Sequence, residues 1–326
     1  MVSYIFSDKT GTLTQNIMEF QKFSAGEFKY GVDKPEGVTY APGVTNVNFD
    51  DPDLKNVLND ENHPNHENVK RFVETIGLCH TVITDVKQTD KGENYTIYNA
   101  SSPDELAIVN GARHLGFAFD SRDDDGNMVC KAWGVERRYK LLNVIEFDST
   151  RKRMTVIVRT PEGEILVLCK GADSIIEKRL LPNQKALATT QGFLDTFAET
   201  GLRTLLVAGK TISQYEYDQF AMAYLQAATS TDKEKEMNRV SSELEVDFEL
   251  IGSTAIEDKL QEDVGDTIAD IRAATIRVWV LTGDKVETAM NIGMSCKLLD
   301  NEMNTFILQS PKIEVIKEEV ETFIAQ

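Results

Sequence analysis

The chain has 326 residues and a formal net charge of −18. This acidity argues against a broad nucleic-acid-binding surface, because phosphate backbones are bound by clustered lysine and arginine. The length suggests about two domains. Four scattered cysteines with no C-x-x-C pair indicate reduced thiols and exclude a disulfide framework or a cysteine zinc site. No apolar run approaches the ~20 residues that span a bilayer, so we expect a soluble chain.

The first predicted element is a short strand over residues 2–6, whose β-branched and aromatic composition indicates burial. It runs directly into the string "SDKTGTLTQN". Residues 31–68 are polar and contain prolines, and the stretch "NDENHPNHEN" within them is predicted to form an exposed loop. His63 and His66 could ligate a metal there, but no third ligand is evident, and a solvated loop is the favoured interpretation.

The middle of the chain mixes helical and strand patterns. A helical pattern covers 69–84, and another begins at "SSPDEL", where serine can cap a helix and proline suits its first turn. Three strand-like segments follow, "YKLLNVIEF", "RMTVIVRT" and "EILVLCK", and the "PEG" turn predicts a hairpin between the last two. After them come a further strand, "TLLVAGK", and a long charged helical region over 213–242. This part is therefore predicted to be α+β with antiparallel strands.

The last part alternates strands and helices. "FELIGSTAI" is predicted to be a strand, 261–274 a helix, "IRVWVL" a buried strand and 286–296 a helix. Such alternation implies parallel βαβ units. Because residues 2–6 have the same buried character, we predict one parallel-sheet domain, split in sequence, into which the α+β middle is inserted. A further helix is predicted over 311–325.

Polar residues follow two of the predicted parallel strands. Ligands of open parallel sheets bind beyond the carboxyl ends of the strands, where Asp8 is expected to lie. The threonine hydroxyls of "DKTGTLT" and the charge of Lys9 can line an anion pocket there. A carboxylate in such a pocket repels phosphate unless a cation such as Mg²⁺ lies between them. Asp8 could then attack a phosphoryl group and become an aspartyl phosphate.

The string "TGDK" is the second such turn. Thr282, Gly283 and Asp284 follow a predicted strand and precede a predicted helix, where backbone N–H groups favour a phosphate oxygen. A T-G-D turn alone is weak evidence, since most such turns only end strands. If the two strands are parallel neighbours, however, Thr282 comes close to Asp8.

With "TGDK" following it, the string "DKTGTLT" resembles the phosphorylation motif of P-type ATPases, and the resemblance covers nearly the whole chain. It implies an α/β fold in which a haloacid-dehalogenase-like phosphorylation (P) domain is interrupted by a nucleotide-binding (N) domain. The expected boundaries are 1–24 and 250–326 for the P domain and 25–249 for the N domain. The strings "SSPDELAIVNGARHLGF", "EFDSTRKRMTVIVR", "LCKGAD", "TGLRTL" and "IEDKLQ" are similar to the P4 branch, the phospholipid flippases, and the last best discriminates against calcium and sodium pumps.

The resemblance also implies roles for individual residues. Asp8 is the phosphate acceptor and, with Thr10, a ligand of Mg²⁺, and Phe147 stacks on the adenine of ATP. The remaining nucleotide and phosphate contacts that it implies are Lys9, Thr10, Glu105, Ser149, Lys170, Arg203, Thr282, Gly283 and Asp284. Without the resemblance, Phe147 would be predicted to be core and Lys170 a surface charge. The run Arg151-Lys152-Arg153 is predicted to be a partly solvated face with no site role for its two arginines.

The implied partners are ATP, Mg²⁺, a phospholipid handled by a membrane region, and a possible accessory subunit, with the chain on the cytosolic face of a membrane. Thr275 stands where flippases commonly have glycine, and no Gly-Asp-Gly string occurs. The resemblance therefore implies a P domain that is incomplete, truncated before its end, with little turnover. The alternatives are an isolated nucleotide-binding module without turnover, a cation-transporting P-type ATPase, and a soluble haloacid-dehalogenase phosphatase with a large cap.

Overall fold

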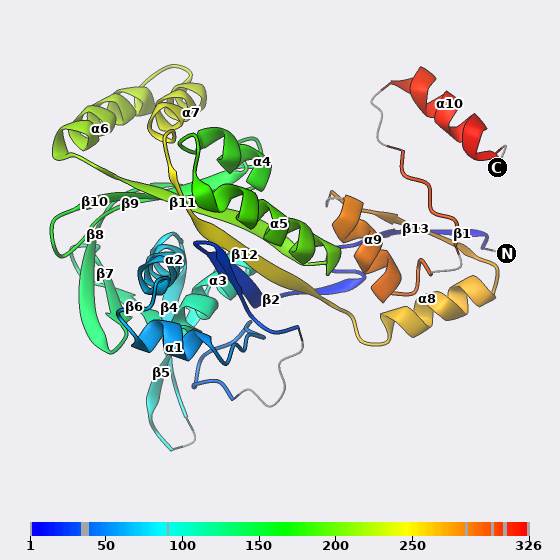
Figure 1. Ribbon diagram of the computed structural model, residues 1–326, viewed down its shortest axis with the longest axis horizontal. Helices are drawn as coiled ribbons and strands as arrows, with labels where there is room; N and C mark the ends of the chain where they lie inside the picture. The colour runs from blue at the N-terminus through cyan, green and yellow to red at the C-terminus, as the bar shows by residue number, and fades with distance from the viewer. Residues whose placement is uncertain are drawn as a thin grey trace.

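The computed structural model is mixed α/β (Figure 1). It describes residues 2–33, 39–89, 91–283, 286–300, 303–308 and 312–324. Within these residues the dominant feature is a sheet whose strands are, in sheet order, β3 (Phe28–Tyr30), β2 (Thr14–Ala25), β12 (Glu249–Leu260), β11 (Arg203–Ile212), β10 (Ile165–Gly171), β9 (Arg153–Arg159), β8 (Val135–Ile145), β7 (Met128–Ala132) and β6 (Phe117–Arg122). The hairpin predicted at "PEG" is confirmed, because β9 and β10 pair antiparallel across it.

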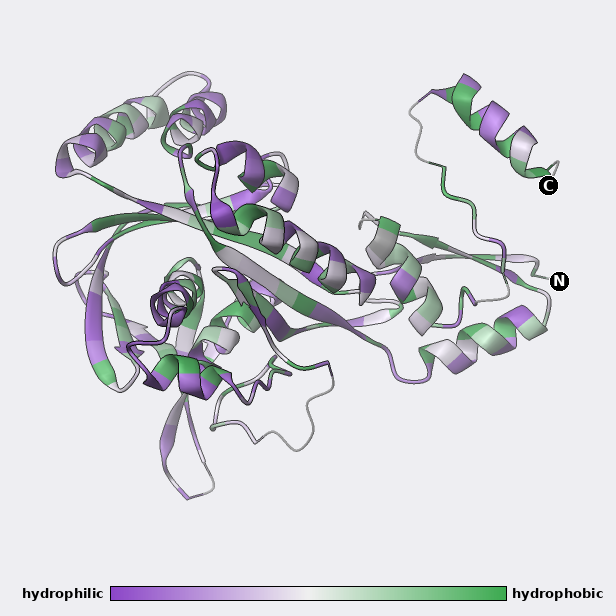
Figure 2. Ribbon diagram, in the orientation of Figure 1, coloured by the Kyte–Doolittle hydropathy of each residue, from purple (hydrophilic) through white to green (hydrophobic). Residues whose placement is uncertain are grey.

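Helices cover both faces of the large sheet. The helices that share the first hydrophobic core are α1 (Leu54–Asn59), α2 (His66–Leu78) and α3 (Pro103–His114). Those of the second core are α4 (Asp173–Ile176), α5 (Lys185–Glu199), α6 (Gln214–Ala228) and α7 (Lys233–Leu244). Because β9 is buried on both faces, its sequence is a nearly continuous apolar run. Figure 2 shows hydrophilic and hydrophobic residues alternating along α6 and α7, as expected of helices with one face on the core.

Local sequence explains where several helices begin. The Ser102 hydroxyl accepts a hydrogen bond from the Glu105 backbone N–H at 3.4 Å and so caps α3. Ser213 and Glu216 form a reciprocal capping box at the start of α6. The long helical region predicted over 213–242 is in fact two helices, because the chain turns between α6 and α7.

The first core is built around stacked aromatic rings. The ring of Phe23 on β2 lies 4.7 Å from that of Phe72 on α2, centroid to centroid, with an interplanar angle of 8°. Tyr30 on β3 stacks against Phe23 at 4.9 Å. The exposed loop predicted at "NDENHPNHEN" is wrong at its end, because His66 is buried in α2 with its Nδ1 2.8 Å from the Val57 carbonyl oxygen.

A long two-stranded ribbon connects the large sheet to a small parallel one. Strands β2 and β12 pair antiparallel from Gly252↔Ala25 to Leu260↔Thr14, with two register shifts between Ala255 and Leu260. The pairing of β11 with β12 ends at Ile256, so beyond that residue β12 is described as pairing with β2 alone. Figure 1 shows the ribbon running toward β1 (Tyr4–Asp8) and β13 (Arg277–Leu281). The proposed domain boundaries, 24/25 and 249/250, fall at the end of β2 and the start of β12, and they remain a prediction.

Two expectations about strands need correction. β12 was predicted to belong to parallel βαβ units, but it pairs antiparallel with both β2 and β11. A strand's own sequence does not state the direction of its partner. Among the strand pairs of the described residues, only β1–β13 is parallel, from Tyr4↔Arg277 to Asp8↔Leu281, and that pair was predicted. Both of those strands were predicted to be buried, yet Phe6 and Trp279 are 66% and 55% exposed. Within the described residues these strands pair only with each other, and the packed core lies on the opposite face, with Val280.

The remaining elements are the β4–β5 hairpin (Ile83–Gln88 and Asn94–Asn99) and the helices α8 (Val264–Ala273), α9 (Val286–Ser295) and α10 (Ile313–Ile324). The helical pattern predicted over 69–84 therefore ends earlier, in α2, and gives way to β4. In the described part of the chain, no helix is both long enough and apolar enough to cross a bilayer.

Candidate phosphorylation and nucleotide sites

The Asp8 carboxylate lies at an exposed strand end. β1 ends at Asp8, and the chain then turns so that the backbone N–H groups of Thr12, Leu13 and Thr14 all donate to the Lys9 carbonyl oxygen. Gly11 has a φ of +73°, which an L-residue with a side chain rarely adopts. The Lys9 backbone N–H donates to Asp8 Oδ1 at 2.8 Å. One carboxylate oxygen is thus fixed by the backbone, while the residue itself remains open to solvent.

Thr282 and Gly283 lie beside this turn, as the sequence predicts. Asp8 is in register with Leu281, and the Lys9 N–H donates to the Leu281 carbonyl oxygen at 3.2 Å, which ties the two strand ends together. Both Thr282 and Gly283 are exposed. Asp284 was also predicted to contact phosphate, but it lies outside the residues that the structure describes.

Lys9 is not a solvent-exposed counter-charge. Its side chain is buried, 1% exposed for the whole residue, and its Nζ lies 2.8 Å from Oδ2 of Asp258, which is equally buried. The pair joins the turn that follows Asp8 to β12 across a long sequence separation. The lysine charge is therefore balanced by a carboxylate within the protein, and a direct contact of Lys9 with phosphate stays a prediction.

A second group of predicted residues gathers around the first turn of α3. Lys170, at the end of β10, places its Nζ 3.5 Å from Oε1 of Glu105, and both residues are buried. Arg203, at the start of β11, places Nη1 3.2 Å from Oδ2 of Asp104. Thr81 donates its hydroxyl to Glu105 Oε2 at 2.8 Å. Lys170 is thus an internal cation whose ammonium is held at the edge of the helix that Ser102 caps.

Phe147 and Ser149 lie in the loop between β8 and β9. Phe147 is 63% exposed, and Ser149 is also exposed. Phe147 lines a hollow of about 370 Å³ together with residues of α6 and α7. Among the described contacts, none joins either residue to Lys170. The structure therefore brings Glu105, Lys170 and Arg203 together at the first turn of α3. The loop that carries Phe147 and Ser149 lies apart from this group in the described contacts.

His80 is a buried polar residue that the sequence did not single out. Its Nδ1 accepts a hydrogen bond from the Val82 N–H at 3.1 Å, and its ring packs edge-on against Phe119. Nε2 has no partner among the described residues. Burial, reinforced by the charge of Lys170, lowers the pKa of His80 to about 3. The imidazole is therefore neutral at physiological pH.

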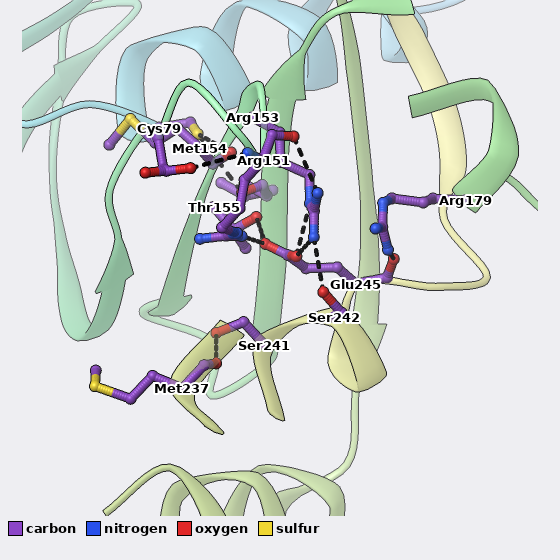
Figure 3. Close-up of polar contacts among 12 residues, drawn as sticks. Cys79, Arg151, Arg153, Met154, Thr155, Arg179, Met237, Ser241, Ser242 and Glu245 are labelled. Carbon is purple, nitrogen blue, oxygen red and sulfur yellow. Dashed lines mark hydrogen bonds and ion pairs between the residues drawn. The ribbon is translucent and has the colours of Figure 1, made fainter. Parts of the chain in front are cut away.

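The predicted solvated face at Arg151-Lys152-Arg153 is wrong for both arginines. Arg151 and Arg153 are buried and form ion pairs with Glu245, whose side chain is fully buried just beyond α7 (Figure 3). Nothing in the local sequence indicates this partner, because Glu245 lies more than ninety positions away. A buried carboxylate can be matched to its arginines only once the strands are assembled.

A family profile described as "P-type ATPase, cytoplasmic domain N" matches residues 68–263, more than half of the chain. The chain belongs to the P-type ATPase family.

Three similar proteins are named phospholipid-transporting ATPases. It is 42% identical to phospholipid-transporting ATPase IC of Xenopus tropicalis, over 96% of this chain and 25% of that protein. It is 43% identical to phospholipid-transporting ATPase DRS2 of Saccharomyces cerevisiae, over 94% of this chain and 23% of that protein. The mouse phospholipid-transporting ATPase ID is 41% identical, over 98% of this chain and 27% of its own length. The chain thus spans about a quarter of the length of these relatives.

The buried Lys9–Asp258 pair gives a prediction for stability. Asp258→Asn would remove a carboxylate that pairs with the buried Lys9 ammonium, so we expect a loss of roughly 3–5 kcal/mol in the free energy of unfolding. The matched control is Asp266→Asn, which breaks an exposed pair with Lys297 and should change the free energy of unfolding far less. Urea denaturation of the three proteins measures both changes. Equal small losses would contradict the prediction.

The lowered pKa of His80 predicts acid sensitivity. The unfolded chain binds a proton at this histidine below about pH 6.5, whereas the folded chain resists protonation until about pH 3. The contribution of the neutral, buried His80 to the free energy of unfolding is fully present above pH 6.5. It is lost progressively as the pH falls, and the loss reaches about 3 kcal/mol at pH 4. His80→Gln should flatten this dependence in denaturation curves recorded at several pH values. The control, His63→Gln in a partly exposed turn, should keep the wild-type slope.

Proposed function

We propose that the chain is the ATP-binding and phosphorylation region of an ATP-driven phospholipid transporter, in which Asp8 accepts the γ-phosphoryl group of ATP. One observation carries the proposal: the parallel pairing of β1 with β13 puts the exposed Asp8 carboxylate beside the Thr282-Gly283 turn. The carboxyl edge of a parallel sheet is where such folds bind phosphate ligands. The names of the relatives favour the phospholipid branch over a cation-transporting one.

The group around α3 is proposed to bind the nucleotide. The Lys170–Glu105 pair is long for an ion pair, at 3.5 Å, so its ammonium can exchange this contact for one to a nucleotide. Arg203 supplies a second, partly exposed cation near the same helix turn. Phe147 offers an exposed aromatic face on which a purine can stack, and Ser149 a hydroxyl in the same loop. These groups are the ones a purine triphosphate requires.

The proposed chemistry is an in-line phosphoryl transfer. A carboxylate oxygen of Asp8 forms a bond to the γ-phosphorus, the bond from that phosphorus to the β–γ bridging oxygen breaks, and ADP leaves with the electron pair. The hydrogen bond from the Lys9 N–H orients the carboxylate through Oδ1. Thr282, at the neighbouring strand end, is proposed to hold the phosphoryl oxygens.

The exposed Asp8 carboxylate fits a magnesium ion that binds together with a nucleotide. No three His, Cys, Asp or Glu side chains of the described chain cluster into a metal site of their own. Mg²⁺ typically binds through one or two carboxylates and substrate phosphates, which suits the single exposed Asp8. Asp8 and Thr10 are the proposed protein ligands. When bound, the ion neutralises the charge that develops between carboxylate and phosphate.

Phosphorylation of Asp8 is proposed to drive the movement of a phospholipid across a membrane in the full-length protein, with this region on the cytosolic side. An accessory subunit of that protein remains a prediction.

Nucleotide binding can be tested at Lys170. Lys170→Ala removes a cation from the proposed pocket, so the affinity for ATP should fall about tenfold, equivalent to ~1.4 kcal/mol. Isothermal titration calorimetry of the chain measures the change. The control is Lys140→Ala, which removes an exposed lysine of β8 and should leave the affinity unchanged. If both variants bind ATP like the unmodified chain, Lys170 has no place in the site.

The phosphate acceptor can be tested in the full-length protein. Incubation with γ-labelled ATP and Mg²⁺ should transfer label to the protein, and Asp8→Asn should abolish the transfer because an amide cannot attack phosphorus in this way. Asp270→Asn, on the exposed side of α8, should retain the label. Labelling that survives Asp8→Asn would remove Asp8 from the proposed role.

A further inference from the structure

We propose that Glu245 is a positioning residue for the nucleotide site, because its buried carboxylate fixes the loop that presents Phe147. The proposal rests on the proposed function, since it concerns how ATP is held. Glu245 follows α7 directly and lies far in sequence from the loop, over residues 146–152, that it contacts. Here the loop is called the Phe147 loop.

The carboxylate of Glu245 is saturated by groups from the end of this loop and from β9 (Figure 3). Its Oε2 lies 2.7 Å from Arg153 Nε and 2.6 Å from Arg153 Nη2. Its Oε1 accepts from Arg151 Nη2 and, at 2.6 Å, from the Thr155 hydroxyl. The side chain of Glu245 is fully buried, so water does not share these contacts. One carboxylate therefore sets the place of two arginines and a threonine.

The contact is transmitted through the backbone of the Phe147 loop. Arg153 Nη1 donates to the Arg151 carbonyl oxygen at 3.0 Å, so the guanidinium that pairs with Glu245 also binds the main chain of the loop. Asp148 Oδ1 accepts from the N–H groups of Thr150 and Arg151 and folds the preceding turn onto Arg151. The position of Arg151 thus determines the turn that begins next to Phe147.

The side chain of Phe147 is not packed into a hydrophobic core of the described residues. Its ring is 63% exposed and belongs to none of the hydrophobic clusters of the described residues. A core phenylalanine is fixed by the side chains packed around it, whereas an exposed one is fixed by its backbone. The orientation of this aromatic face therefore depends on the anchored loop.

The same residue fixes the opposite wall of the hollow. The hollow beside Phe147 is lined on its other side by Met237, Asn238 and Ser241 of α7. Ser242, also on α7, accepts a hydrogen bond from Arg153 Nη2 at 3.1 Å, and Arg179 Nη1 donates to the Glu245 carbonyl oxygen at 3.0 Å. Glu245 thereby holds the C-terminal end of α7 and the Phe147 loop in one arrangement.

Charge makes Glu245 hard to replace. Arg151, Arg153 and Arg179 converge on this one residue. Glu245→Gln keeps the shape of the side chain but removes the negative charge, so the buried arginines repel one another and the loop loses its anchor.

A double-mutant cycle tests the proposal. ATP affinity is measured by calorimetry for the unmodified chain, Glu245→Gln, Phe147→Ala and the double variant. If Glu245 acts through Phe147, Glu245→Gln lowers the affinity about tenfold when Phe147 is present and less than about twofold in the Phe147→Ala background. A purely structural Glu245 would give the same fold-change in both backgrounds, and that result overturns the proposal.

Two further variants keep the test decisive. Glu243→Gln, an exposed substitution of the same kind on α7, should leave ATP affinity unchanged in both backgrounds. If Glu245→Gln does not fold, Thr155→Val replaces it, because this change removes one hydrogen bond to Oε1 and keeps both ion pairs. Its smaller loss, about two- to threefold, should again require Phe147. A failure of the unmodified chain to bind ATP would refute the proposed function and this inference together, whereas equal losses in both backgrounds would refute the inference alone.

Discussion

Strands β2 and β12, which lie far apart in sequence, pair antiparallel, and this pairing is the constraint on which the rest of the structure depends. It inserts both strands into the large sheet, where β12 also pairs with β11. It brings Asp258 to Lys9, and so connects the turn that follows Asp8 to a strand of the large sheet. The ribbon thus connects the large sheet, which carries Lys170 and Arg203, to the turn that follows Asp8.

Buried ion pairs mark the places where distant segments must meet. Lys9–Asp258 lies where the ribbon joins the turn after Asp8, and the Glu245 contacts lie where α7 meets the Phe147 loop. A buried charge without a partner is strongly destabilising, so a buried ion pair favours the arrangement that keeps its two partners together. In this protein both pairs connect segments that chain connectivity alone would leave independent.

The sequence predicted the parts of the fold that depend on local pattern. The position of Asp8 at a strand end, its neighbour Thr282 and the β9–β10 hairpin follow from short apolar runs and turn residues, and the structure has them. The burial of β1 and β13 was predicted from composition and is wrong, because exposure depends on how many strands and helices cover the pair. Glu245, Asp258 and His80 could not be found, because their partners lie on other strands and leave no periodic signal in the sequence.

The ribbon also determines where the molecule is mechanically weakest. In the described nine-stranded sheet every strand except the two edge strands is paired on both sides, but beyond Ile256 the described ribbon has only two strands. Its register shifts just before Ile256 and again between Asp258 and Leu260. Each slip interrupts the ladder of backbone hydrogen bonds and bends the strand locally. We therefore expect elastic deformation to concentrate in this two-stranded segment, which contains Asp258, so that bending there acts first on the turn that follows Asp8.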